Sequence, residues 1–292
     1  MRLLLASLLL ASSLGAAGAA ECGPDKLGTS RVMSVGVSGG LEVGLKTYPR
    51  TLALADHEVI LTFDDGPAPG TTARVLDALA RECVRATFFL IGRNALAMPQ
   101  LVRREAREGH TIGHHTFSHP AATLRSMTFE AARDDIARGI AADEAALSER
   151  DATPDPAGAP HPRTPFFRFP GFADTPQLRD WLAASNIGVF GADLWASDWI
   201  AMSPQEELAL TLGRLEREGR GILLFHDTQG WTADMLPDFL RALKRRGYRV
   251  VHMSPGAGAA PTREAPPGWT SETERIIGRL TRGLRGTSVP AL

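Results

Sequence analysis

The sequence predicts an α/β fold in which a parallel sheet closes into a barrel or a barrel-like arrangement. From Glu58 onward, short apolar runs alternate with segments of helical length. A parallel strand pair needs a crossover connection, which is usually a helix, so this alternation favours parallel pairing. The chain has 292 residues, of which 43% are apolar, and this suits one substantial core. We therefore expect a single main domain.

The individual elements follow from composition and from boundary signals. Seven runs are predicted to be strands: residues 59–63, 87–91, 111–112, 166–169, 187–190, 222–225 and 249–251. Six segments are predicted to be helices: residues 71–83, 99–108, 128–147, 176–185, 204–218 and 236–246. Thr128 and Ser203 are suitable N-caps, and Pro204 suits a first helical turn. Residues 152–165 are rich in Pro, Gly and Ala and are predicted to form a surface loop.

The N-terminus has the pattern of a secretory signal peptide over residues 1–20. Arg2 is followed by the apolar run 3–14 and by small residues at 15–20. A buried N-terminal helix is the alternative, because the run is too short to cross a bilayer. We expect a mature chain that begins near Glu21 and is exported, to the periplasm or outside the cell. Glu21 before Cys22 fits a lipoprotein signal poorly, and no later apolar segment is long enough for a transmembrane anchor.

Charge and cysteine content limit the partners and the compartment. With 32 Lys and Arg against 33 Asp and Glu, the chain lacks the basic character of a nucleic-acid-binding protein. Cys22 and Cys83 are the cysteines of the chain. In an oxidising compartment they are expected to form a disulfide; the alternative is two unrelated thiols, with Cys83 as a small buried residue on a helix.

Residues capable of acid–base or metal chemistry follow the predicted strands. Asp64 and Asp65 follow the first strand, where an Asp-Asp-Gly-Pro sequence is by itself typical of a turn. His115 and His119 are four residues apart, so one helical turn would direct both imidazoles toward one cation. Two imidazoles and a carboxylate suit Zn²⁺ with open coordination positions. The neighbouring His114 is expected to point elsewhere, in a supporting or packing role.

Three further groups lie near later strand ends. Arg168 lies among aromatic residues and needs an anionic partner, for which the carboxylates after Phe63 are the candidates. Asp198, beside Trp199, offers another acid. His226 ends an apolar strand, and a solvated histidine is the simplest alternative explanation for it.

These segments, in this order, resemble the polysaccharide deacetylase family of NodB-homology domains, also called carbohydrate esterase family 4. The resemblance covers residues 58–253 and rests on five motifs: Thr62-Phe63-Asp64-Asp65-Gly66, His115-Thr116-Phe117-Ser118-His119, Arg168-Phe169-Pro170, Asp198-Trp199 and Leu224-Phe225-His226. It implies an irregular parallel (β/α) barrel of about seven strands. Together with the signal-peptide pattern, it gives the expected organisation: a signal peptide at 1–20, an N-terminal extension at 21–57, a catalytic domain at 58–254, and a linker with a short C-terminal helix at 255–292.

The resemblance further implies a role for each motif residue. Asp65, His115 and His119 would hold a divalent metal, Zn²⁺ first, with Co²⁺ or Ni²⁺ as alternatives. Asp64 would be the general base that activates water at the metal, and His226 the general acid for the leaving group. Arg168 would orient Asp64, and Asp198 would tune His226. Gly171, Trp199 and Leu224 would contact the substrate or its oxyanion.

Two positions depart from the family pattern. Gly171 replaces the aromatic residue that usually follows the proline of the third motif, so the oxyanion N–H is kept while a sugar-facing wall is lost. The two acids of the fourth motif are usually closer together than Asp193 and Asp198. We therefore expect Asp198, rather than Asp193, to act on His226.

The predicted activity is hydrolysis of a carbon–nitrogen bond other than a peptide bond, removing acetyl groups from an acetylated polysaccharide or oligosaccharide. The cation would lower the pKa of water and polarise the acetyl carbonyl. An amidohydrolase of small non-sugar amides and a non-catalytic carbohydrate-binding envelope protein are the alternatives. The oligomeric state is not predicted. The C-terminal residues Ile276, Ile277, Leu280 and Leu284 recur at helical spacing and are expected to dock on the body rather than to do chemistry.

Overall fold

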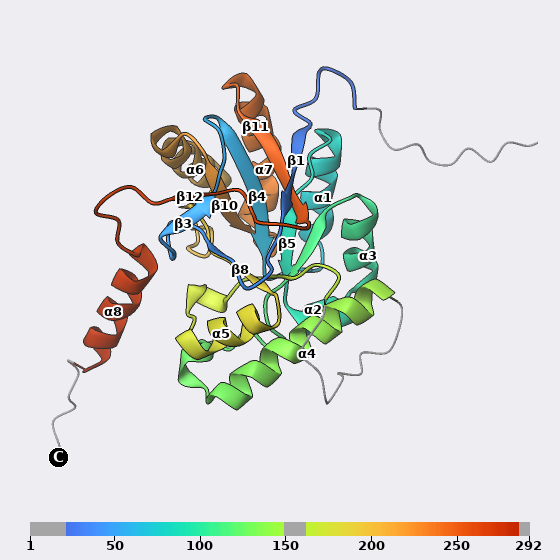
Figure 1. The fold of residues 1–292 in the computed structure, drawn as a ribbon. Coiled ribbons are helices and arrows are strands. Elements are labelled where there is room, and N and C mark those ends of the chain that lie inside the picture. The colour runs from blue at the N-terminus through green and yellow to red at the C-terminus, as the bar shows by residue number, and fades with distance from the viewer. Residues whose placement is uncertain (1–21, 149–161, 286–292) are drawn as a thin grey trace, which may run out of the picture.

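The computed structural model describes residues 22–148 and 162–285, which form an α/β fold around a mostly parallel sheet (Figure 1). The predicted signal peptide and most of the predicted 152–165 loop lie outside the described residues. The strands are β1 (Thr29–Val35), β2 (Glu42–Val43), β3 (Arg50–Leu52), β4 (Glu58–Asp64), β5 (Thr87–Leu90), β6 (Thr111–His114), β7 (Phe166–Phe167), β8 (Gly188–Phe190), β9 (Leu194–Trp195), β10 (Gly221–His226), β11 (Arg249–Pro255) and β12 (Thr262–Glu264).

Ten of the described strands belong to one sheet, in the order β1-β11-β4-β5-β6-β7-β8-β2, with β10 between β4 and β9. The seven predicted strands correspond to β4, β5, β6, β7, β8, β10 and β11, so the predicted fold class is confirmed. The predicted closure is not seen. The pairings of the described strands run from β2 to β4, where they branch to β11 and β1 on one side and to β10 and β9 on the other, and they do not form a complete ring. β12 pairs with β3 in a separate antiparallel ribbon.

The described helices surround the curved sheet (Figure 1) and pack on its outer side, whereas the side that carries Ile60 packs against other strands and loops. These helices are α1 (Thr72–Arg81), α2 (Gly92–Ala97), α3 (Pro99–Arg107), α4 (Phe129–Ser148), α5 (Pro176–Ala184), α6 (Pro204–Glu218), α7 (Gly230–Arg245) and α8 (Glu272–Arg285), with 3₁₀ turns η1 (Leu124–Ser126) and η2 (Pro170–Phe172). Two predictions were wrong in detail. Helix α2 was not predicted, and α7 begins six residues before the predicted 236, with Pro237 inside it.

The helix-start signals act as expected. Ser203 caps α6 in a capping box, in which its hydroxyl accepts from the backbone N–H of Glu206 and the Glu206 carboxylate accepts from the N–H of Ser203. The backbone N–H of Ala131 donates to Thr128 at the start of α4, over 3.3 Å.

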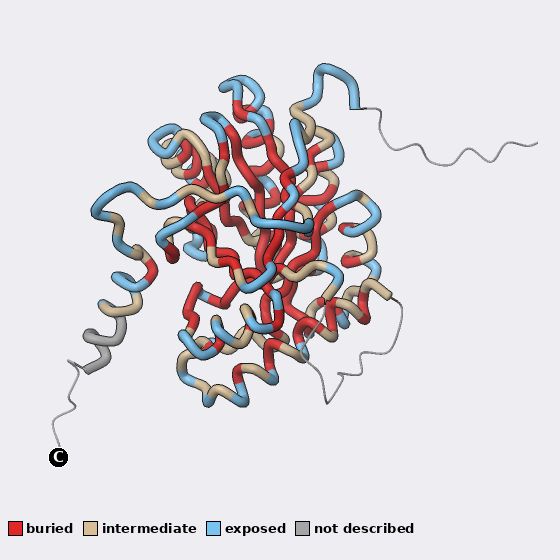
Figure 2. The backbone as a smooth tube through the Cα atoms, in the orientation of Figure 1, coloured by how far each residue is buried: buried red, intermediate tan, exposed pale blue. Residues whose placement is uncertain are grey.

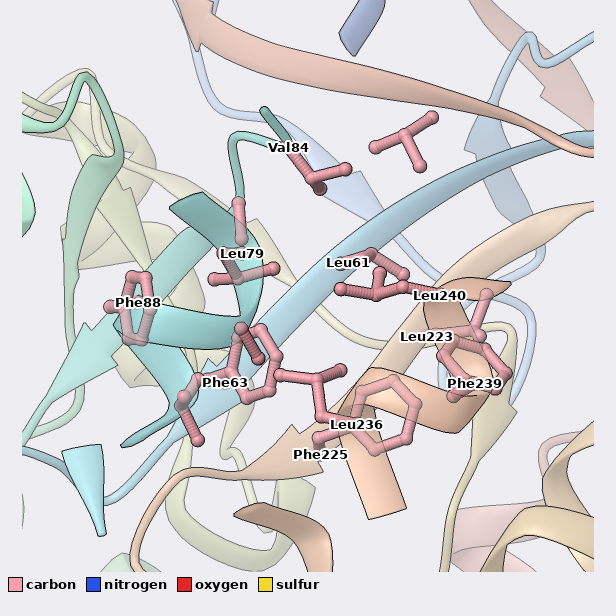
Figure 3. Close-up of a cluster of buried hydrophobic side chains, with 14 of the residues drawn as sticks. Leu61, Phe63, Leu79, Val84, Phe88, Leu223, Phe225, Leu236, Phe239 and Leu240 are labelled. Carbon is pink, nitrogen blue, oxygen red and sulfur yellow. The ribbon is translucent and has the colours of Figure 1, made fainter. Parts of the chain in front are cut away.

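The core lies on both sides of β4 and β10. On β4, Leu61 and Phe63 contact one apolar cluster, which Figure 3 shows packing against α1 and α7, while Ile60 contacts another. Alternate residues of a strand face opposite sides of the sheet, so every residue of β4 can be buried. Asp64 and Thr62 face the same side of the sheet as Ile60. On this side the hydroxyl of Thr62 accepts a hydrogen bond from Arg168. Figure 2 shows the strands buried along most of their length, with exposed residues concentrated in loops and on outer helix faces.

Both ends of the described chain are tied to this body. The predicted disulfide is present and joins Cys22 to Cys83, just beyond α1. β1 extends the sheet by pairing with β11 in parallel. Helix α8 lies at the edge of the body (Figure 1), where Thr273 is buried against Thr47. Within residues 22–148 and 162–285, the helices fall short of the length and apolar character that a bilayer crossing needs.

Candidate active site

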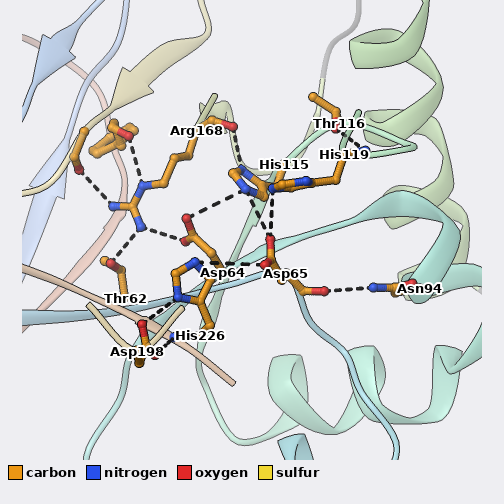
Figure 4. A network of polar contacts seen from close by, with 12 residues as sticks. Thr62, Asp64, Asp65, Asn94, His115, Thr116, His119, Arg168, Asp198 and His226 are labelled. Carbon is orange, nitrogen blue, oxygen red and sulfur yellow. Dashed lines mark hydrogen bonds and ion pairs between the residues drawn. The ribbon is translucent and has the colours of Figure 1, made fainter. Parts of the chain in front are cut away.

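The predicted site residues meet at the carboxyl ends of the parallel strands, where α/β proteins place their sites. Asp64 ends β4 and His226 ends β10, and the register of these neighbouring strands places the two residues directly opposite each other. Asp65 follows β4, and His115 follows β6 (Figure 4). Strand register therefore brings a carboxylate and an imidazole together although 162 positions separate Asp64 from His226.

Asp65, His115 and His119 form a cluster with the chemistry of a cation site. One ligand atom from each lies within 4.8 Å of the other two. Oδ1 of Asp65 is 3.4 Å from Nε2 of His115 and 3.4 Å from Nε2 of His119, and it is buried without a hydrogen-bond partner among the described residues. Burial opposes the charge on Asp65, but the imidazoles of His115, His226 and His119 outweigh it and lower its pKa.

The orientation of His115 is set from behind. Its Nδ1 lies 2.7 Å from the carbonyl O of Arg168. A carbonyl can only accept, so Nδ1 carries the proton and Nε2, the ring nitrogen facing Asp65, presents its lone pair. Asn94, on α2, donates to the backbone carbonyl of Asp65 over 2.9 Å. The lone pair of His115 Nε2 and the free Oδ1 of Asp65 therefore both point toward the centre of the cluster.

The segment that carries the two histidines is not helical, so the expected helical turn between them was wrong. Thr116 and His119 have positive φ angles of 68° and 47°, yet the two imidazole centroids lie 5.1 Å apart. The loop is held on α4, where the carbonyl of Asp135 accepts from Phe117 N–H. A Cβ at Gly139 of α4 would lie 2.4 Å from the carbonyl carbon of Thr116. Glycine at 139 therefore permits the close packing that shapes the loop.

Comparison with known proteins agrees with this geometry. The polysaccharide deacetylase family matches residues 52–156. A Bacillus cereus peptidoglycan-N-acetylglucosamine deacetylase is 29% identical over 70% of this chain and 72% of its own length. The solved structure of a Bdellovibrio bacteriovorus peptidoglycan deacetylase superposes with a TM-score of 0.66, at 31% identity, over 78% of this chain and 59% of that one. The chain is thus similar to polysaccharide deacetylases in both sequence and fold.

A higher local identity is found over a shorter stretch of the chain. A second Bacillus cereus peptidoglycan-N-acetylglucosamine deacetylase is 57% identical over 22% of this chain, and that stretch spans only 23% of the relative's length. The family match itself contains Asp64, Asp65, His115 and His119 but ends before Arg168. Arg168, Asp198 and His226 lie beyond the residues that the family matches.

Arg168 is the largest fully buried side chain among the described residues, and it holds Asp64 in place. Its Nη1 donates to Oδ1 of Asp64 over 2.7 Å and to the hydroxyl of Thr62 over 2.8 Å. Its Nε and Nη2 donate to the carbonyls of Phe190 and Gly191. The predicted anionic partner of Arg168 is thus Asp64. The other oxygen of Asp64, Oδ2, lies 3.9 Å from Nε2 of His115, facing the cluster.

His226 is held by Asp198 on the other side of the cluster. Its Nδ1–H donates to Oδ1 of Asp198 over 2.8 Å, and its backbone N–H donates to Oδ2 over 2.6 Å. Burial acts to lower the pKa of His226, but the Asp198 carboxylate outweighs it and raises that pKa to about 9. Nε2 of His226 faces the cluster, 3.9 Å from Oδ2 of Asp65.

Two residues behind Asp198 were missed from the sequence. The hydroxyl of Thr232 lies 2.9 Å from Oδ2 of Asp198 and 3.0 Å from Oε1 of Glu207. Burial, and then the nearby Asp198, raise the pKa of Glu207 to about 8, so Glu207 is protonated at neutral pH and can itself donate to Thr232. Thr232 is then free to donate to Asp198. The signal that was available is that Glu207 is the second of two adjacent glutamates in the first turn of α6.

Two other predicted positions lie away from the cluster. His114 is fully buried, with Nδ1 2.7 Å from Asp143, and is not one of the clustered ligands, as expected. Asp193 accepts from Thr51 and from the backbone N–H groups of Leu45 and Ile222. It therefore supports the chain around β9 and does not contact His226.

The cluster opens into a cavity of about 320 Å³. The predicted substrate residues Gly171, Trp199 and Leu224 line it together with the metal-type cluster, Asp64 and His226. The remaining lining residues are Phe169, Phe172, Trp195, Thr273, Ile276 and Ile277. The last three belong to α8, which docks on the body as expected and does so beside the cavity.

Unusual backbone conformations surround this cavity. Asp65, Phe172 and Ser197 have φ angles of 75°, 55° and 64°, values that non-glycine residues seldom adopt. Gly171, with φ 59°, adopts the same region without a side-chain penalty. Such residues gather where surrounding structure imposes a local geometry, often at functional sites.

Proposed function

We propose that this protein is a metal-dependent hydrolase that removes acetyl groups from N-acetylated sugars of a polysaccharide or oligosaccharide. The observation that carries the proposal is the placement of a carboxylate, Asp64, and a protonated imidazole, His226, around one cluster of cation ligands. A binding module has no use for a base and an acid on either side of a cation site. The relatives named above are deacetylases of peptidoglycan.

The cluster fits a divalent cation with N and O ligands. Asp65, His115 and His119 would hold it, because Oδ1 of Asp65 has no other partner and Nε2 of His115 presents a lone pair. Two imidazoles and one carboxylate favour Zn²⁺, with Co²⁺ and Ni²⁺ as alternatives, and leave positions for substrate. The bound cation would supply polarisation of the acetyl carbonyl and a lowered pKa of water.

The protein groups would then divide the two proton transfers. Asp64, fixed by Arg168, takes a proton from water as the water oxygen attacks the acetyl carbon. The carbon–nitrogen bond breaks, and His226 gives the proton on Nε2 to the departing amine. Asp198 holds the imidazole by Nδ1, so that Nε2 is the nitrogen that serves the substrate.

Gly171, Leu224 and Trp199 are proposed to receive the acetyl group and the sugar. The backbone N–H of Gly171 is the candidate donor to the oxyanion, a role that does not depend on a side chain. Leu224 lines the same cavity, and Trp199 leaves 47% of its surface exposed at the cavity rim. An exposed indole face suits contact with a sugar ring.

The polymer itself is not assigned, and peptidoglycan, chitin-like oligomers, xylan and an exopolysaccharide remain candidates. We further propose export to the periplasm or cell exterior, which the signal-peptide pattern at residues 1–20 and the disulfide of Cys22 with Cys83 support. The proposed domain limits are 21–57, 58–254 and 255–292. N-terminal sequencing of the mature protein should begin near Glu21, and recovery of Met1 on the functional protein would contradict export.

The proposed activity is tested by acetate release from N-acetylated and O-acetylated saccharides, with small non-sugar amides in parallel. Chelation should abolish release and added Zn²⁺ should restore it. Full activity in a verified metal-free sample would contradict the cation's role. Activity confined to the small amides would favour the amidohydrolase alternative, and no hydrolysis with retained sugar binding would favour the binding protein.

A further inference from the structure

The start of α8 is fastened to the body at two places beside the cavity. Within residues 44–48, the backbone carbonyl of Lys46 accepts from Thr273 N–H over 3.0 Å, and Lys46 pairs with Glu272. The Thr47 hydroxyl meets that of Thr273 in a buried contact of 3.0 Å. Arg125, in η1, pairs with Glu274 through its two terminal nitrogens, Nη1 and Nη2. The first turn of α8 is therefore held in one position.

One face of the fastened helix lines the cavity. Thr273, Ile276 and Ile277 are spaced i, i+3 and i+4, which places them on the same side of a helix. Arg279 lies on the exposed surface of α8 and is not among the cavity residues. The fastening thus determines which face points inward, and the inward face is aliphatic.

The cavity has two kinds of lining. The cation ligands, Asp64 and His226 supply polar groups at one part of it, whereas Phe172, Trp195 and Trp199 supply aromatic surface. Ile276 retains 37% of its surface exposed, so apolar area remains for a ligand to cover. At about 320 Å³ the cavity is at the small end of the range for small-molecule sites, roughly 300–1,000 Å³.

We propose that Ile276 and Ile277 of α8 determine specificity, by forming an aliphatic wall against the sugar residue that carries the acetyl group. The proposal rests on the deacetylase function proposed above. Carbohydrate rings expose C–H groups that aliphatic and aromatic side chains can cover. Gly171 contributes no side chain to the cavity, whereas α8 contributes apolar surface to it. Helix α8 lies outside residues 52–156, which the family matches.

The test compares the Zn²⁺-loaded double variant Ile276→Ala/Ile277→Ala with wild type and with Arg279→Ala. The substrates are an N-acetylglucosamine oligosaccharide and a small activated acetyl ester. We expect KM for the oligosaccharide to rise about tenfold in the double variant, in line with the loss of apolar contacts in a pocket. The kcat values, the ester kinetics and all values for Arg279→Ala should stay at the wild-type level.

Several results would overturn the proposal. An unchanged KM for the oligosaccharide would remove any contact with the sugar, and a lower KM would mean that the isoleucines obstruct the cavity. Equal losses on sugar and ester would indicate a general effect on the site and would overturn the proposal. A thermal melt shows whether that general effect is misfolding.

Failure of the deacetylase function itself is visible separately, in wild type. If wild type hydrolyses the ester but releases no acetate from sugars, the function proposed above fails. The wall is then judged by calorimetric binding of the oligosaccharide. Weaker binding by the double variant would support it, and equal or undetectable binding by both proteins would overturn it.

Discussion

Two neighbouring groups of side chains differ in how their hydrogen-bonding atoms are satisfied. One is the cluster of Asp65, His115 and His119, and the other is the pair of His226 and Asp198. In the cluster, Oδ1 of Asp65 is buried with no partner among the described residues, and burial and His115 lower the pKa of His119. In the pair, both oxygens of Asp198 accept hydrogen bonds, and the pKa of His226 is raised to about 9.

The difference separates two kinds of site built from the same residue types. Ligand atoms that converge without protons between them are suited to an external cation. An imidazole whose carboxylate partner is already satisfied is suited to hold a proton. Neighbours, rather than residue identity, therefore decide whether a histidine serves as a ligand or as an acid.

The largest expected effect is on the cation-binding side. His119→Ala should lose the cation, and its activity should fall by more than the roughly 10²–10³-fold that loss of one oxyanion donor costs. His114→Ala is the matched control: it should melt at a lower temperature, because His114 is fully buried, yet still bind the cation. Metal content after dialysis measures both. Loss of the cation from His114→Ala alone would reverse the assignment.

Asp64→Asn should separate catalysis from cation binding. The change keeps the shape of the side chain but removes the base, so kcat should fall about 10²–10⁴-fold. The cation should stay bound, since Asp65 is the proposed ligand and Asp64 is paired with Arg168. Retained metal with retained activity would show that another group accepts the proton.

The acid side is tested by the leaving group. His226→Ala should lower kcat/KM for an N-acetyl sugar about 10²-fold or more, whereas an activated ester, whose leaving group needs no proton, should lose much less. Equal fractional losses on both substrates would remove the acid role from His226.

The pH dependence tests the source of the His226 proton. The Asp198 carboxylate raises the pKa of His226, so the protonated, active form is present below about pH 9 and is lost as the pH rises through that value. Asp198→Asn removes the carboxylate and should move the alkaline limb of the kcat/KM profile to lower pH. An unmoved limb would assign it to another group.

The smallest effect is expected behind Asp198. Thr232→Val keeps the side-chain shape but removes the hydroxyl that joins Asp198 to Glu207. Loss of a hydrogen bond to a charged group should reduce kcat about tenfold. Thr232→Ser should restore most of the rate, because it restores the hydroxyl. A Ser variant as slow as the Val variant would point to packing of the methyl group instead.

Local pattern was enough to place most of the fold and the central site residues. The apolar runs that became β4, β6 and β10 placed Asp64, His115 and His226 at strand ends, and parallel strand ends meet at one edge of a sheet. The predicted start of α7 at 236 was wrong: the helix begins at Gly230 and holds Pro237 in its interior, where proline usually disrupts a helix. The helical turn expected between His115 and His119 failed because Gly139 and Asp135 of α4, distant in sequence, shape that loop.

The sequence alone determined the fold class, the anionic partner of Arg168, and the choice of Asp198 over Asp193 beside His226. These depend on residue type, strand periodicity and the resemblance of five ordered motifs. Only the tertiary structure decided that Thr232 and Glu207 support Asp198, and that Ile276 and Ile277 reach the cavity. Those contacts join separate elements. The face of α8 that points into the cavity is set by a contact between Thr273 and Thr47, which the periodicity of the helix sequence cannot reveal.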